Sequence, residues 1–503
     1  MQDCPAEFMN VGGKCNCMPL LAKYGAHCNI DTGNISSPMY TDGWIGVVNN
    51  LTIGLSRHCP SGYCKPQLRE ADLSISGSFC DGKRTGVMCG LCDSKAGLSV
   101  QFRSTECGSC SNVWLLSIPV YALAGIVLVL LLFALRLTVD KGTVNGLIFY
   151  ANILGINARY FLRDGKLQFL LIFLSLINLE LGFPVCFYNG MDDIVKTGLQ
   201  FAFPIYIWSI VIFITLASCC STRVSRLTSQ SSVQVLATLI HLSYSKLLST
   251  TVDILVYETV ETESHNGSIN HSYIAWYFDG NVQYITEGHV VLFIFALLTL
   301  TLFVIPYTVI LTGASFFVRY KVINYFKPVF DAYYGPYKDK WRFWFGIRLW
   351  VLVAILIIYT ILENNKQLIL ILHLVLLLLF ILVQACIKPF KNTLIGWLDL
   401  FFMVNYSAVA LVMVHSQSPR SQAIVTIIGV LVGTTLVAFI CIIFYHIYLT
   451  CNLQRYCPRT PRVNEAMRGV GGYVSLEGSN YDRVYNAGHE NVRFRETLLE
   501  SQC

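Results

Sequence analysis

Four apolar stretches near the C-terminus constrain this fold more than any other feature of the sequence. They cover residues 342–362, 367–387, 394–414 and 423–449, of which the third is the most mixed. Each is long enough to cross a hydrocarbon core as an α-helix, which takes about 20 apolar residues. Only Glu363 to Lys366 separate the first stretch from the second, so these two are predicted to form an antiparallel transmembrane hairpin.

Charged residues are too few for an ordinary soluble enzyme. They make up 13% of the 503 residues, whereas about 25% is typical of soluble domains, and 54% of the residues are apolar. The net charge of +6 is no sign of nucleic-acid binding, because the basic residues concentrate in short loops beside apolar stretches, where they orient a membrane protein. The lipid bilayer is therefore an expected partner, and nucleic acid is not.

Five further membrane spans are expected upstream of this block. They are residues 113–139, 168–188, 199–219, 233–257 and 289–315, which bring the expected total to nine. Residues 143–162 are apolar in places but interrupted by Asn and Arg, and we interpret them as an interfacial or re-entrant helix. The predicted fold class is an all-α integral membrane protein, in which a transmembrane domain at 113–450 follows a small disulfide-rich extracellular domain.

The charges of the loops predict the orientation. The loop 258–288 contains no Lys or Arg and carries sequons at Asn266 and Asn270, whereas the loop 316–341 contains five basic residues. Basic loops remain in the cytoplasm, so we expect a plasma-membrane protein with its N-terminus outside and its C-terminus inside. If residues 143–162 also crossed the membrane, every later loop would change sides. Residues 451–503, which are low in apolar residues, are expected to be a disordered cytoplasmic tail.

The first 112 residues are predicted to be a separate, cysteine-dense extracellular domain. They hold 11 of the 19 cysteines and few long apolar stretches. Such a domain usually depends on disulfides formed in an oxidising compartment, and sequons at Asn34 and Asn50 agree with that location. The odd count leaves one thiol over, for which Cys186 is a candidate partner. The candidate disulfide cysteines are Cys4, Cys15, Cys17, Cys28, Cys59, Cys64, Cys80, Cys89, Cys92, Cys107, Cys110 and Cys186.

Two CxxC pairs, Cys89–Cys92 and Cys107–Cys110, allow two interpretations. Their separation approximates that of a four-thiolate zinc site. Zinc thiolates suit a reducing compartment and the sequons indicate an oxidising one, so disulfides are favoured and no metal or other cofactor is expected. No signal peptide precedes Cys4, so we expect either that one has been removed or that the N-terminus is incomplete.

One expected span carries a stripe of polar side chains. Ser243, Lys246, Thr250 and Asp253 follow a spacing of three, four and three residues, which places them on one helical face. They would either line a water-filled path, where Lys246 and Asp253 tune ion passage, or hold neighbouring helices together by hydrogen bonds. The other ionisable residues in expected spans are Glu180, Arg348, His373 and Asp399. Structural pairing is expected for each, for example between Arg348 and Asp399.

Three stretches resemble an uncharacterised family of multi-pass membrane proteins of simple animals with a cysteine-rich ectodomain. They are residues 84–92 (RTGVMCGLC), 142–152 (GTVNGLIFYAN) and 331–340 (DAYYGPYKDK). The back half, about a third of the chain, also resembles TRP-like and polycystin-like channels. That resemblance is carried by the aromatic and basic loop 337–344 and by residues 388–392 (KPFKN), and it implies a conducting pore.

Several functions remain open at this point, but no enzyme is expected. The sequence has no Walker-type phosphate loop, no HExxH and no GxSxG, and no catalytic residue is assigned. The first hypothesis is a TRP-like cation channel or channel-related sensor whose ectodomain receives a ligand or a force. The second is an orphan cell-surface receptor or adhesion protein without a pore.

A secondary transporter using Lys246 and Asp253 is a third hypothesis, although no inverted repeat is visible. A seven-span G-protein-coupled receptor is disfavoured by the count of nine spans, but the loss of two weak spans would revive it. An unknown extracellular ligand and a homo-oligomer are the partners considered for the first two hypotheses.

Overall fold

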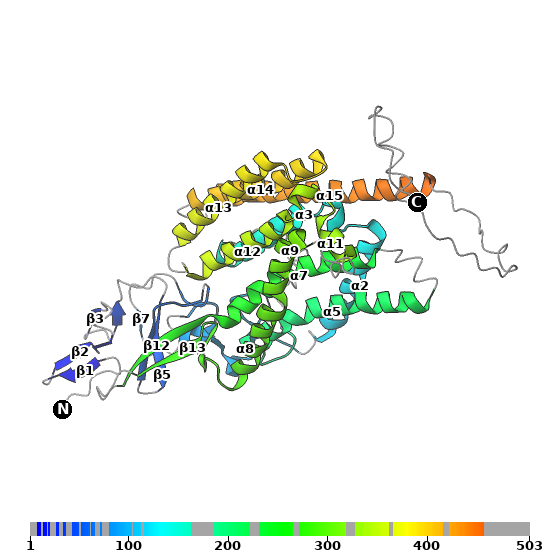
Figure 1. Cartoon of the computed structure of the whole chain (residues 1–503). Coiled ribbons are helices and arrows are strands. Elements are labelled where there is room, and N and C mark those ends of the chain that lie inside the picture. Colours follow the sequence, from blue (N-terminus) through cyan, green and yellow to red (C-terminus); the bar gives the residue numbers. More distant parts are fainter. Residues whose placement is uncertain are drawn as a thin grey trace. The chain divides into compact units, whose positions relative to one another are not determined.

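The computed structural model describes most of the chain. The described residues are 8–11, 14–17, 19–20, 27–29, 34–36, 43–49, 52–60, 62–65, 71–72, 80–102, 104–111, 115–161, 186–221, 231–264, 271–317, 327–361, 366–415 and 422–456. They form a helical part and a β-rich part (Figure 1). Residues 1–442 make one compact unit and residues 443–503 a second.

Seven helical stretches of the described chain are long and apolar enough to cross a membrane, which indicates a multi-pass membrane protein. They are Ser117–Lys141, Asp193–Ser218, Gly288–Gly313, Asp339–Thr360, Gln367–Ile387, Thr393–Val412 and Thr426–Tyr448. The helices concerned are α2 (Ser117–Leu135), α5 (Asp193–Cys220), α8 (Glu287–Thr299) with α9 (Ile305–Phe317), α12 (Trp344–Ile361), α13 (Lys366–Ile387), α14 (Thr393–His415) and α15 (Gln422–Tyr456). Since α15 runs to Tyr456, the expected tail begins later than residue 451, and residues 457–503 lie outside the described residues.

These stretches coincide with seven of the nine expected spans, so nine spans are not confirmed. Residues 233–257 do form a helix, α7 (Ser232–Leu255), but it is too polar to qualify by composition. Of the expected span 168–188, residues 168–185 lie outside the described residues and 186–188 are not helical.

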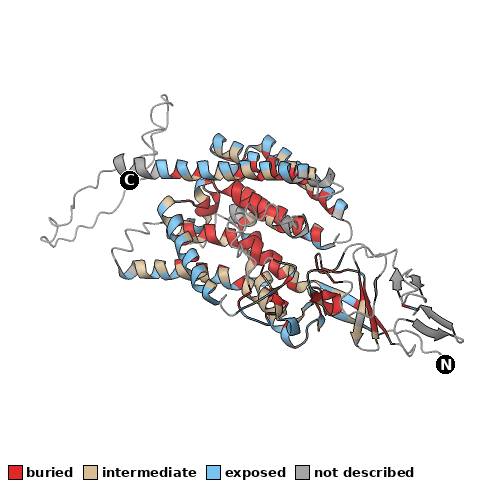
Figure 2. Cartoon of the chain, turned by 180° about the vertical axis from the view of Figure 1, so that it is seen from behind, coloured by how far each residue is buried: buried red, intermediate tan, exposed pale blue. Residues whose placement is uncertain are grey.

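The stretch 143–162, expected to be an interfacial or re-entrant helix, contains a helix that is buried among other helices. Helix α3 (Asn145–Phe161) is enclosed by protein, and the side chains from Leu147 to Leu154 are at most 3% exposed. It packs against α7, α12 and α14, among the buried helices drawn red in the middle of Figure 2. Of the polar residues that interrupt its apolar pattern, Asn152 accepts a hydrogen bond from Ser245 of α7 at 2.8 Å.

The fold is not all-α, which corrects the predicted class. Among the described residues, five strands form one sheet in the order β14-β13-β12-β6-β5. Strands β5 (Trp44–Asn49) and β6 (Thr52–Ser56) belong to the cysteine-rich region, whereas β12 (Tyr257–Ser264), β13 (His271–Trp276) and β14 (Asp279–Gln283) come from the segment between α7 and α8. The antiparallel pairing of β6 with β12 places Ser56 opposite Val260.

Shorter strands complete the cysteine-rich region. They are β1 (Phe8–Val11) with β2 (Lys14–Cys17), β3 (His27–Asn29) with β4 (Asn34–Ser36) and β7 (Ala71–Asp72), β8 (Arg84–Thr85) with β9 (Leu91–Cys92), and β10 (Leu98–Val100) with β11 (Cys107–Ser109). Four disulfides join described residues: Cys59–Cys64, Cys80–Cys89, Cys92–Cys107 and Cys110–Cys186. The two CxxC pairs are thus divided among three disulfides. Cys15, Cys17 and Cys28 lie in strands, and Cys4 is outside the described residues.

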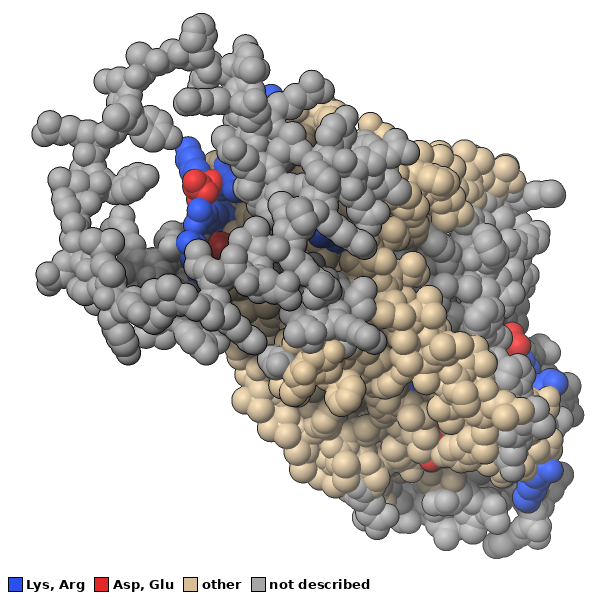
Figure 3. All heavy atoms as spheres, turned by 90° about the vertical axis from the view of Figure 1, so that its right-hand side faces the viewer, with Lys and Arg blue, Asp and Glu red and all other residues tan. Residues whose placement is uncertain are grey.

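Connecting segments meet at two separate ends of the helical part. At one end, the five-stranded sheet and the Cys110–Cys186 disulfide join the cysteine-rich region to the segments before α5 and before α8. At the other end, the amide of Lys338 donates to the carbonyl of Pro389 at 2.9 Å, and the amide of Lys391 donates to that of Pro336 at 2.8 Å. We call these the sheet end and the basic end, because exposed Lys338, Lys340, Lys388 and Lys391 lie at the latter. Figure 3 shows charged side chains toward its margins and a largely uncharged surface between them.

The sheet end has an anchor residue that can be tested. Trp276 is fully buried, its Nε1 donates to the carbonyl of Asp253 at 3.0 Å, and its ring lies 5.4 Å from that of His289. Trp276→Ala should lower the free energy of unfolding by about 3–5 kcal/mol, the usual cost of truncating a buried aromatic side chain. Denaturation of the purified protein in mixed micelles measures this. Trp397→Ala, at a site that is 67% exposed, is the control, and equal losses in both variants would contradict the anchor role.

Candidate functional site

The polar stripe predicted from the sequence lies on α7, the helix around which the bundle packs. Of its 24 residues, 16 are buried. Ser243 and Thr250 are 0% exposed and Lys246 is 8% exposed, whereas Asp253 is half-buried. Three of the four stripe residues are therefore covered by other parts of this single chain.

The hydroxyl groups of the stripe bind to α5. The Nε1 of Trp208 donates to the Oγ of Ser243 at 3.1 Å, and the Oγ1 of Thr250 donates to the Oε1 of Gln200 at 2.9 Å. Other faces of α7 are bonded too, because Ser245 reaches Asn152 of α3 and the hydroxyl of Tyr244 lies 2.6 Å from that of Thr308 on α9. The geometry favours the interpretation that the stripe holds neighbouring helices together by hydrogen bonds.

Both ends of α7 are also tied to neighbouring segments. At the sheet end, the carbonyls of Asp253, Ile254 and Leu255 face donors on Trp276, His289 and Tyr284 at 3.0, 3.2 and 2.8 Å. The last carbonyls of a helix have no partner within it, so these bonds complete its C-terminus.

At the basic end, Tyr333 of α11 (Lys327–Tyr334) donates its hydroxyl hydrogen to the carbonyl of Ala237 at 3.2 Å. The amide of Val139, in the short helix η4 (Val139–Lys141), donates to the Oγ1 of Thr238 at 3.0 Å. One helix therefore makes direct hydrogen bonds with the segments at both ends of the bundle.

A buried ion pair joins four helices near the basic end. Arg348 of α12 and Asp399 of α14 lie 2.7 Å apart, with side chains 2% and 1% exposed. Gln384 of α13 donates to the second oxygen of Asp399 at 2.7 Å, and Arg348 also donates to the carbonyl of Asn145 on α3 at 3.1 Å. The Arg348 guanidinium carbon lies 4.6 Å from the centre of the Phe149 ring. This cluster fixes which helices meet, because each polar group needs a partner on another helix.

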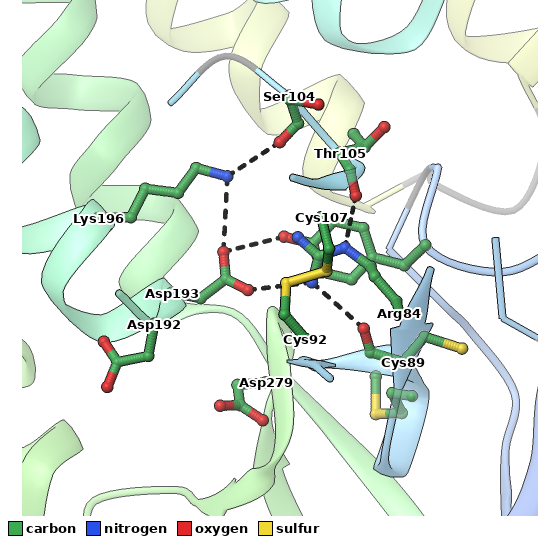
Figure 4. A network of polar contacts seen from close by, with 12 residues as sticks. Arg84, Cys89, Cys92, Ser104, Thr105, Cys107, Asp192, Asp193, Lys196 and Asp279 are labelled. Atoms are coloured by element: carbon green, nitrogen blue, oxygen red, sulfur yellow. Dashed lines mark hydrogen bonds and ion pairs between the residues drawn. A yellow bond between two sulfur atoms is a disulfide. The ribbon is translucent and has the colours of Figure 1, made fainter. Parts of the chain in front are cut away.

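A second buried ion pair, which was not predicted from the sequence, lies at the sheet end (Figure 4). Arg84 of β8 and Asp193, the first residue of α5, lie 3.2 Å apart with side chains 0% and 3% exposed. Asp193 also accepts a hydrogen bond from the hydroxyl of Tyr63 at 3.1 Å and lies 3.5 Å from the Nζ of Lys196. A carboxylate at the start of a helix is favoured by the helix dipole as well.

Arg84 links this pair to the disulfide-bonded loops. Its Nη1 donates to the carbonyl of Cys89 at 3.2 Å, its Nε donates to that of Thr105, and its guanidinium carbon lies 3.5 Å from the Tyr63 ring centre. Burial, and then the charge of Asp193, raise the pKa of Tyr63, so its hydroxyl remains a neutral donor. The only hints in the sequence are an arginine among cysteines and an Asp-Asp pair six residues after Cys186, where a disulfide brings the two regions together.

The other residues singled out in the sequence do not join either cluster. His373 is 0% exposed, its Nδ1 lies 3.4 Å from the hydroxyl of Tyr359, and its ring is 5.4 Å from that of Tyr406. Glu180 lies outside the described residues, as do the sequon residues Asn50, Asn266 and Asn270, while Asn34 lies in β4. Glycosylation at these four sequons stays a prediction.

Comparison with known proteins adds no relative. No model of a protein family matches the chain, and neither a curated protein nor a solved structure is significantly similar to it.

The contribution of the Arg348–Asp399 ion pair to stability can be tested. Arg348→Met strands the Asp399 carboxylate and should cost about 3–5 kcal/mol of the free energy of unfolding, whereas Arg348→Met combined with Asp399→Leu should cost less than either single change. Denaturation in mixed micelles measures all three. The control is Arg342→Met, whose partner Asp339 is 78% exposed and whose loss should cost at most about 1 kcal/mol. Additive losses in the double variant would show that the two charges do not interact.

Proposed function

We propose that this protein is a multi-pass cell-surface sensor in which α7 passes the state of the ectodomain to the opposite end of the bundle. The observation that supports this most strongly is the pair of bonded ends of α7. The carbonyls of residues 253–255 are held by the segment that carries β12, β13 and β14, and residues 237 and 238 are held by α11 and η4. A displacement of the sheet therefore acts directly on a helix that reaches the basic end.

The input side of this sensor would be the cysteine-rich region with its sheet. β6 and β12 belong to the same sheet although about 200 residues separate them, so a ligand or force acting on the cysteine-rich strands also acts on the segment after α7. The Cys110–Cys186 disulfide and the Arg84–Asp193 pair hold α5 to the same region. We place this end outside the cell, because short basic loops favour the cytoplasm and the short connections that carry Lys338, Lys340, Lys388 and Lys391 lie at the other end.

A conducting pore is the second candidate function. It is supported by a π-helical turn at Leu300–Val304, between α8 and α9, because such turns are frequent at functional sites. It is also supported by the resemblance of the back half to TRP-like channels. Since Ser243, Lys246 and Thr250 are covered within one chain, a pore would run elsewhere than along this stripe.

Hydrogen exchange tests the transmission through α7. Trp276→Phe keeps an aromatic ring but removes the hydrogen bond to Asp253. We expect several-fold faster exchange both at residues 250–290 and at residues 327–343, because loosening the sheet end of α7 weakens its contact with Tyr333. Trp397→Phe serves as the control. Faster exchange confined to residues 250–290 would contradict transmission along the helix.

Whole-cell current in a null background separates the sensor from the channel. Wild type is compared with Lys246→Ala under voltage, stretch and osmotic challenge. We expect no current that depends on Lys246, because this side chain is 8% exposed and lies among helices. A current that is present in wild type and altered in Lys246→Ala would place this residue in a pore and overturn the pore-free sensor.

A further inference from the structure

Asp279, the first residue of β14, is a buried carboxylate beside the Arg84–Asp193 cluster. Its exposure is 3%, and the charges of Asp193 and Asp192, drawn above it in Figure 4, act on it. Within the described part of the chain its hydrogen bonds come from Asn281 alone, whose amide and Nδ2 donate to the same oxygen at 3.0 and 2.9 Å, and no cation lies within ion-pair distance. A buried charge without a cationic partner is costly.

The short helix η1 (Val87–Cys89) rests directly on this carboxylate. A Cβ at Gly90, which follows η1, would lie 2.5 Å from the Oδ1 of Asp279. Asn281 connects the two segments, because its Nδ2 binds Asp279 while its Oδ1 accepts from the amide of Val87 at 3.1 Å. The ionisation of Asp279 therefore bears on the contact between η1 and β14.

Helix η1 is also bonded to the Arg84–Asp193 ion pair. Cys89 of η1 forms a disulfide with Cys80, and its carbonyl accepts from Arg84, whose Nη1 also reaches Asp193 on α5. Among the described residues, none offers a hydrogen-bond partner to the buried Nη2 of Arg84. The cluster is therefore incompletely satisfied as it stands.

The charges around Asp279 do not balance. Among the described residues, the charged and titratable groups near it are Tyr63 and Arg84 from the cysteine-rich region, Tyr273 from β13, and Asp192, Asp193 and Lys196 from the start of α5. Two cations thus face three carboxylates, and one bound proton would make the cluster neutral. Burial first, and then the charges of Asp193 and Asp192, raise the pKa of Asp279 to about 6.

We propose that Asp279 is an extracellular proton-binding site, and that its protonation tightens the packing of η1 on β14. Protonation removes the cost of a buried charge and the repulsion from Asp192 and Asp193. That this change is signalled through α7 rests on the proposed function, whereas proton binding at Asp279 does not, so the two can fail separately.

The direction of the pH effect follows from linkage. A carboxyl group whose pKa is higher in the folded protein than in the unfolded chain binds its proton more tightly when folded. The contribution of Asp279 to the stability of the fold is therefore complete below the ordinary pKa of an aspartate, 3.8. It is lost as the pH rises through the folded-state pKa of about 6. Mild acid should tighten the junction and neutral pH should loosen it.

Asp279→Asn tests the site in the full-length protein in nanodiscs, because asparagine resembles the protonated carboxyl in shape and charge. We expect the variant to unfold several degrees above wild type at pH 7.5, and this difference to shrink markedly near pH 4.5. Hydrogen exchange at residues 84–92 should be faster in wild type than in the variant at pH 7.5, and the two rates should approach each other near pH 4.5. Comparing the two proteins at one pH removes the intrinsic pH dependence of exchange.

Two further variants keep the test decisive. Glu106→Gln removes an exposed carboxylate of the same region. This variant should behave like wild type, with the same unfolding temperature relative to Asp279→Asn at both pH values. Asp192→Asn retains a good helix cap for α5 but removes one repelling charge, so it should move the wild-type transition to lower pH. If Asp279→Asn does not fold, the shift in Asp192→Asn alone decides. A difference that does not change between pH 4.5 and 7.5, or an unmoved transition in Asp192→Asn, would overturn the proposal.

Discussion

The structure depends on satisfying the polar groups of α7 inside an apolar bundle. A buried donor or acceptor without a partner costs about 1–3 kcal/mol, and this helix carries hydroxyls at Ser243, Ser245 and Thr250 as well as the carbonyls at its C-terminus. Their partners come from α5, α3, β13 and α8. None of these elements can be displaced without leaving a polar group of α7 unbonded, so the helix determines which segments surround it. The same bonds make α7 the direct link between the sheet end and the basic end.

The two buried ion pairs fix the ends of the bundle in different ways. Arg348 and Asp399 join the four helices α3, α12, α13 and α14, so they specify how helices meet within the bundle. Arg84 and Asp193 join a disulfide-bonded loop to the first turn of α5, so they specify how the cysteine-rich region packs on that helix. Desolvation consumes much of the attraction in such pairs. Their contribution is therefore better seen as the selection of one arrangement than as a large gain in stability.

Those parts of the fold that depend on local sequence were predicted well. A membrane span requires only about 20 consecutive apolar residues, and seven of the nine expected spans coincide with apolar helices. The burial of helix α3 was not predicted, because Ser245, which donates to its Asn152, lies 93 positions further along the chain. Residues 258–288 were treated as a loop because β12 needs β6, about 200 residues earlier, to form a sheet. The Arg84–Asp193 pair likewise depends on long-range contacts, since the two residues are 109 positions apart.

The energy available from Asp279 decides whether a proton could operate such a sensor. A ligand can shift a conformational equilibrium only by its difference in affinity for the two states. When the contact between η1 and β14 opens and the Asp279 carboxyl returns to water, its pKa falls from about 6 to 3.8. Each pKa unit corresponds to a tenfold difference in proton affinity. A difference on the order of a hundredfold moves a two-state junction from mostly open to mostly closed, although less completely than the roughly 10⁴-fold needed for a full reversal. A single buried carboxylate at this junction is therefore sufficient for a graded response to acid, provided that the open state hydrates it.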